Sequence, residues 1–131
     1  MNRPARYVTF LVLVHLVITV AHGAAHRELQ IGLSSPENLF VGLVVVIAPV
    51  LAMGLAWGSR QRFGLKLFAA SMFASLLFGL YHHFLVEGAD HVHSQPEGTW
   101  GKAFVVTAYG LLITEGLGTW MGMHFLRSDN R

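Results

Sequence analysis

The sequence predicts an all-α integral membrane protein, a bundle of four transmembrane helices in a single domain spanning residues 1–131. Composition is the first indication, because 53% of the residues are apolar, 12% are charged and the mean hydropathy is +0.52. The second indication is a set of four apolar runs, at about residues 7–25, 39–57, 67–86 and 103–126. Each run is long enough to cross a bilayer core about 30 Å thick.

The first run follows a short basic segment that carries Arg3 and Arg6. As a helix rising about 1.5 Å per residue, residues 7–25 would extend about 28 Å. A cleaved signal peptide is the alternative interpretation, because a basic start, an apolar centre and small residues near Gly23 are also typical of such peptides.

The second run begins with a helix start signal. Ser34 and Glu37 have the spacing of a capping box, and Pro36 suits the first helical turn. Pro49 lies inside the apolar run, where it removes a backbone hydrogen bond, so we expect a kink in this span.

The third and fourth runs are separated by a polar loop that contains Pro96, and the fourth carries one carboxylate, Glu115, near its middle. Small residues recur in the fourth run at every fourth position. This spacing lets backbones approach closely, either within the bundle or in an oligomer. The residues are Gly110, Thr114, Gly118 and Gly122.

The basic residues predict the orientation. Of the nine lysines and arginines, only Arg27 and Lys102 fall outside the N-terminal segment, the loop at residues 58–66 and the C-terminal segment. The positive-inside rule therefore places both termini in the cytoplasm and the other two loops on the periplasmic or extracellular face of the cell (inner) membrane. The lipid bilayer is then the main partner, with other membrane subunits or a second copy as further ones. No basic cluster indicates nucleic acid.

Histidines gather at the predicted outer ends of spans one and three. His22 and His26 are four residues apart, so they share one face of a helix. His82 and His83 end the third span, and carboxylates and a further histidine follow them. Polar side chains in a membrane are costly unless they are paired. The predicted metal ligands are His22, His26, His82, His83, Glu87, Asp90 and His91.

Imidazole and carboxylate donors without cysteine suit copper(II), iron or zinc better than copper(I). The sequence therefore predicts a transition-metal site, with redox chemistry as one activity that such a site supports. Two alternatives stay open. One is a haem b electron carrier with an axial histidine from each of spans one and three. The other is a non-catalytic accessory subunit of a larger membrane complex. No catalytic residue is identified.

Glu115 is the second polar feature. A charged carboxylate in the middle of a span costs about 2.5–3.5 kcal/mol on insertion scales, so it should be protonated, paired or beside water. His15 lies at a comparable depth in span one and is the expected partner, with Tyr109 and Thr114 as alternatives. The sequence thus predicts that His15 and Glu115 form a proton relay or a buried polar pair.

Overall fold

The computed structural model describes residues 2–128, and every regular element in that range is helical. The elements are, in order, α1 (Arg3–Glu28), α2 (Ser35–Phe40), η1 (Val41–Ile47), α3 (Ala48–Trp57), α4 (Gln61–Leu80), η2 (Tyr81–Leu85), η3 (Val92–Ser94) and α5 (Thr99–Ser128). The elements α2, η1 and α3 form one span, and α4 with η2 forms another. The prediction of an all-α chain with four helices long and apolar enough to cross a membrane is confirmed.

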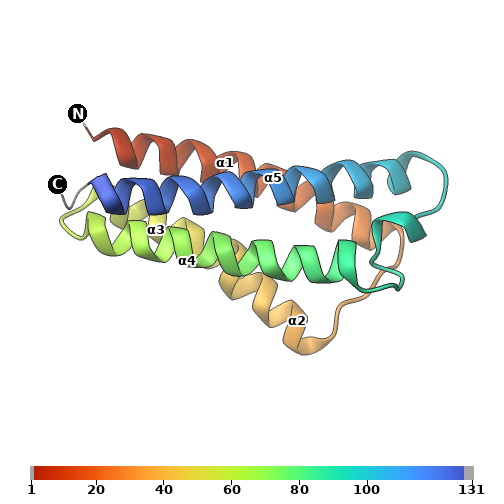
Figure 1. Ribbon diagram of the computed structural model, residues 1–131. Helices are drawn as coiled ribbons and strands as arrows, with labels where there is room; N and C mark the ends of the chain where they lie inside the picture. The colour runs from red at the N-terminus through yellow and green to blue at the C-terminus, as the bar shows by residue number, and fades with distance from the viewer. Residues whose placement is uncertain (1, 129–131) are drawn as a thin grey trace.

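The four spans run side by side along the bundle (Figure 1), and their contacts close into a ring. α5 packs against α1 and α4, and α3 also packs against α1 and α4, so α1 and α4 are diagonal neighbours. The beginning of α1 and the end of α5 lie at the same end of the bundle. We call the opposite end, which carries residues 29–34 and 86–98, the loop end.

Each span begins a little earlier than predicted, because polar residues before the apolar runs are helical too. The side chain of Asn2 caps α1 by accepting a hydrogen bond from the Ala5 amide. The capping box at Ser34 forms as expected: the Ser34 amide donates to Glu37 Oε2, and the Glu37 amide donates to Ser34 Oγ. These caps fix where the first two spans start.

The second span is distorted directly before Pro49. Residues 41–47 form a π-helix, in which each backbone hydrogen bond spans one residue more than in an α-helix. Proline has no amide hydrogen, and its ring crowds the carbonyl four residues earlier, so a widened turn accommodates it. In Figure 1, α2 diverges from the bundle while α3 runs along α4. The kink expected at Pro49 takes this form.

The half of the bundle near the chain ends has an apolar interior, and glycines bring its helices close together. A Cβ on Gly118 would lie 2.8 Å from Met72 Cγ, and one on Gly122 would lie 2.8 Å from Ala69 Cβ. Both glycines of α5 therefore face α4 of the same chain, so this part of the small-residue stripe packs inside the bundle. The core residues are Ala5, Val8, Leu11, Val12, Ala52, Ala56, Leu65, Phe68 and Met72.

The outward surface of the bundle is also apolar. Large side chains such as Val17 and Val20 are each 72% exposed, and Val106 is 68% exposed. Contiguous exposed apolar surface on a monomer marks a partner or a membrane. The polar residues of the spans, in contrast, are collected inside: His15, His22, His83 and Glu115 are buried.

Candidate metal centre

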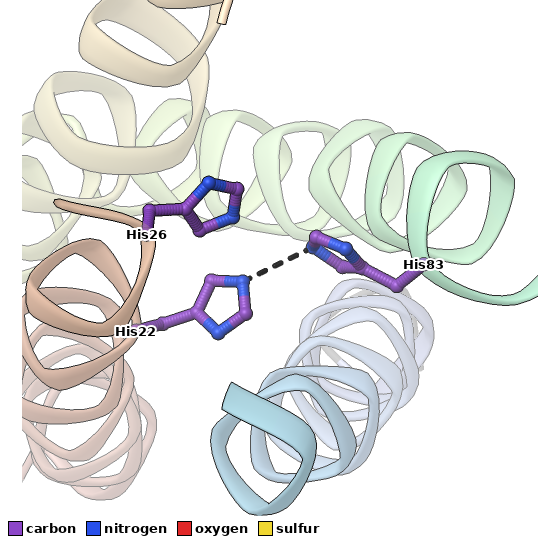
Figure 2. A group of neighbouring side chains, drawn as sticks. All are labelled: His22, His26 and His83. Atoms are coloured by element: carbon purple, nitrogen blue, oxygen red, sulfur yellow. Dashed lines mark hydrogen bonds between the residues drawn. The ribbon is translucent and has the colours of Figure 1, made fainter. Parts of the chain in front are cut away.

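Three histidines converge on the bundle axis near the loop end (Figure 2). His22 and His26 come from successive turns of α1, and His83 comes from η2 on the diagonal span. One ring nitrogen from each lies within 4.8 Å of the other two. The closest pair is His22 Nε2 and His83 Nε2, which are 3.2 Å apart. The three side chains could together hold a metal ion.

A π-helical turn places His83, rather than His82, in this group. Gly79 and Ser75 precede His83 by four and eight positions, and all three line the same cavity. In a regular α-helix, position 82 would lie close to the face of Ser75. Because the turn at 81–85 is π-helical, it is position 83 and not position 82 that returns to the face of Ser75. His83 is therefore buried, and His82 is turned toward α2.

Thr107 fixes the protonation of His22. The Thr107 hydroxyl lies 2.6 Å from the Ala103 carbonyl oxygen, a separation that requires its proton to lie between the two oxygens. The same hydroxyl lies 2.8 Å from His22 Nδ1 and must therefore accept a hydrogen bond from it. In a neutral His22 ring, the lone pair is consequently on Nε2, the atom that faces His83.

Backbone carbonyls fix the other two rings in the same way. His83 Nδ1 donates to the Asp90 carbonyl oxygen at 3.0 Å, and His26 Nδ1 donates to the Ile31 carbonyl oxygen at 3.2 Å. A carbonyl oxygen only accepts, so both Nδ1 atoms carry the hydrogen. When neutral, each of the three rings therefore has its lone pair on Nε2.

The carboxylate of Asp90 lies beside two of the rings. Its Oδ1 is 3.1 Å from His26 Nε2 and 3.2 Å from His83 Nδ1. Burial alone would raise the pKa of this carboxyl, but the imidazole groups of His26 and His83 outweigh burial and hold the pKa below its ordinary range. Asp90 therefore adds a negative charge next to the histidine triad, in a position that attracts a cation.

Phe104 of α5 forms one side of the centre. Its ring centroid lies 4.7 Å from that of His22, 5.0 Å from that of His26 and 5.4 Å from that of His83. Phe104 is fully buried and has apolar neighbours that include Ala25 and Val92. This apolar packing holds the imidazole rings in place and shields one side of the centre.

Besides Asp90, which borders the triad, three of the predicted ligands lie outside it: His82, Glu87 and His91. The ring of His82 packs at a tilt against Phe78, and its Nε2 lies 3.6 Å from Glu37 Oε1. Glu87 is exposed. His91 uses both ring nitrogens elsewhere, since Nε2 donates to the Phe84 carbonyl and Nδ1 accepts from the His93 amide.

His15 and Glu115 meet deeper in the bundle. His15 Nε2 lies 3.2 Å from Glu115 Oε1, and the two side chains are 0% and 4% exposed. His15 Nδ1 has no hydrogen-bond partner among the described residues. α1 and α5 are neighbours in the ring of helices, so the pair lies between two packed spans.

A cavity of about 480 Å³ connects the two polar groups. The histidine triad and Asp90 line one part of it, and Glu115 lines another. Its remaining wall includes residues of the connector 31–33 and of the distorted second span, such as Val41 and Val45.

Thr107 and Phe104 were not among the residues singled out from the sequence. A threonine and a phenylalanine in an apolar span are usually packing residues, and no local pattern distinguishes these two. Their roles depend on which face of α5 meets α1, and this is a property of the folded bundle. No known protein family, curated protein or solved structure matches the chain, so function must be inferred from this geometry.

Proposed function

We propose that this chain is an integral membrane protein that binds one transition-metal ion through His22, His26 and His83. The supporting observation is that one ring nitrogen from each of the three histidines lies within 4.8 Å of the other two, beside the carboxylate of Asp90. With neutral rings, His22 Nε2 faces His83 Nε2 at 3.2 Å, and His26 Nε2 faces Asp90 Oδ1 at 3.1 Å. Lone pairs at these distances repel, so a cation at this position, either a proton on one ring or a metal ion, stabilises the arrangement. A single divalent ion relieves both contacts.

The spacing of the nitrogens suits such an ion. Metal–nitrogen bonds of about 2.0–2.1 Å in tetrahedral geometry place two ligating nitrogens about 3.3 Å apart. The pair formed by His22 and His83 has this separation already, and the ring of His26 closes in on the bound ion. The Nδ1 hydrogen bonds to Thr107 and to two backbone carbonyls orient the rings, as outer partners commonly do at metal sites.

Three histidine ligands leave a coordination position open. Structural zinc sites are closed by four protein ligands, whereas sites that bind substrate or water typically have three. The cavity borders the triad, so a small molecule can reach the ion. Copper or iron would make this a redox centre, and zinc would make it a Lewis acid.

The geometry favours a single ion over haem b. A porphyrin iron with two axial histidines requires their nitrogens on opposite faces of a flat macrocycle, about 4 Å apart. His22 Nε2 and His83 Nε2 are closer than this, and their rings meet edge to face at an interplanar angle of 77°. Phe104 also packs against both rings.

Purification in detergent followed by elemental analysis and a visible spectrum tests this proposal. We expect about one zinc, copper or iron ion per chain and no Soret band. The spectrum also separates the candidates, because copper(II) or iron absorbs and zinc does not. A Soret band in a stoichiometric preparation would assign haem instead. Protein that stays metal-free after incubation with each of the three ions would refute the metal centre.

The membrane orientation follows from the positive charges. We propose that both chain ends face the cytoplasm and that the loop end, with the triad near it, faces the periplasm or cell exterior. Green fluorescent protein fused after Arg131 should fluoresce, and alkaline phosphatase at the same position should be inactive. Alkaline phosphatase inserted after Glu87 should be active. Active phosphatase at the C-terminus would reverse the proposed orientation.

A further inference from the structure

We infer that the cavity is a binding site for a small, uncharged, largely apolar molecule that carries a hydroxyl group. Ser75 and Glu115 would hold that hydroxyl. The inference goes beyond the metal centre and does not depend on it, since both residues lie outside the triad. A bound molecule would, however, lie in the same cavity that the triad borders.

The size and walls of the cavity suit such a molecule. A volume of about 480 Å³ falls within the range of about 300–1,000 Å³ found for small-molecule sites. Nine of the twenty lining residues are aliphatic or aromatic, and polar side chains lie among them, as is usual for a site that binds a small molecule. The apolar lining includes Leu33, Val41, Val45, Phe78 and Leu111.

Ser75 supplies an unused hydroxyl to this cavity. The residue is 1% exposed, and its Oγ has no hydrogen-bond partner among the described residues. Other buried hydroxyls in the spans bond to their own helix: Ser71 donates to the Phe68 carbonyl, and Thr114 donates to the Gly110 carbonyl. A buried hydroxyl without a partner is costly, so a ligand that supplies the missing hydrogen bond binds more tightly.

Glu115 supplies the second polar contact. His15 occupies Oε1, and Oε2 lies next to Gly79, where a Cβ would be 3.7 Å away. Ser75 and Gly79 are one helical turn apart on α4, and Glu115 of α5 reaches that face of α4 beside Gly79, so all three residues line the same cavity. The missing side chain at Gly79 leaves Oε2 open to the cavity.

A hydroxyl is the group that satisfies both residues. It can donate to Glu115 Oε2 and accept from Ser75 Oγ at the same time, which a carbonyl or an ether cannot do. It also brings no charge against the aliphatic and aromatic residues of the lining, where an ion would lose its hydration. A molecule of this kind enters readily from lipid.

Equilibrium dialysis of the full-length protein in detergent, with 2-naphthol as the probe, tests the inference. Naphthalene, which lacks the hydroxyl, is the matched probe. Ser75→Ala removes the proposed donor, and Ser71→Ala is the control because that hydroxyl already bonds to its own helix. Val45→Trp fills the cavity, so the probe that remains bound to this variant gives the background from uptake into detergent micelles. Metal content and helical circular dichroism are recorded on the same samples.

We expect wild-type protein to bind 2-naphthol more tightly than naphthalene, and Ser75→Ala to weaken 2-naphthol binding about fivefold. Ser71→Ala should bind as wild type does, and naphthalene binding should not respond to Ser75→Ala. Equal 2-naphthol affinity in wild type and Ser75→Ala, or wild-type binding no greater than that of folded Val45→Trp, would overturn the inference. A normal metal content in that case would leave the metal centre intact.

Discussion

Replacing His83 with alanine should abolish metal binding, whereas replacing its neighbour His82 should leave metal binding unchanged. His83 Nε2 is 3.2 Å from His22 Nε2 and its ring is buried, but His82 lies against Phe78 and Glu37. Loss of a hydrogen-bond partner of a ligand typically lowers metal affinity 10–100-fold, so loss of the ligand itself should lower it by more than about 100-fold. Metal content after dialysis and a competition titration with a chelator measure the difference.

The two variants form a matched pair, because both remove an imidazole from the same helical turn. Both should insert and fold, since insertion depends on the apolar runs and not on either histidine. The double variant His22→Ala, His83→Ala should be free of metal. Full metal content in this double variant would show that the triad is not the site. Metal loss in His82→Ala alone would place the ion at the surface of the bundle instead.

The spans were predictable because they depend on local composition. Apolar runs with uncharged interiors must be helical in a membrane, where every backbone group needs a partner within the segment. The start of the second span at Ser34 was equally local, since a capping box is encoded within four residues. The orientation of the chain in the membrane, by contrast, stays a prediction from the distribution of positive charges.

The gathering of histidines was also predictable, but the choice among them was not. His22 and His26 lie one turn apart on a regular helix, so their common face follows from helical periodicity. The choice of His83 over His82 depends on a π-helical turn, and nothing in the residues Tyr81–Leu85 marks this turn. This one π-helical turn decides whether the ring of His82 or that of His83 points into the bundle.

Contacts between distant segments could not be read from the sequence. Asp90 was one of several loop residues that could approach the histidines. Its selection depends on how residues 86–91 fold back over η2, where the Asp90 carbonyl accepts from His83. Thr107 is 85 positions from His22, and its hydroxyl could bond to any neighbour. Such partners are set by helix packing, which follows from the sum of many small side-chain contacts.

The last expected result concerns stability. His15→Leu should destabilise the bundle by about 3 kcal/mol, because it leaves Glu115 buried beside an apolar side chain. Glu115→Leu should also destabilise, since it leaves the His15 ring without its partner. The double variant His15→Leu, Glu115→Leu should be less destabilised than either single variant. Replacing both partners of a buried hydrogen bond with apolar groups is often neutral or stabilising, whereas leaving one partner buried and unsatisfied is costly.

A double-mutant cycle measured by unfolding in detergent micelles gives this coupling directly. His124→Leu is the control, because His124 is an exposed histidine on α5, and its replacement should change stability by less than about 0.5 kcal/mol. Additive effects of the two substitutions would mean that His15 and Glu115 do not stabilise each other. Glu115 would then have to be neutral and satisfied by another group, and the 3.2 Å contact between the two side chains would contribute nothing to the fold.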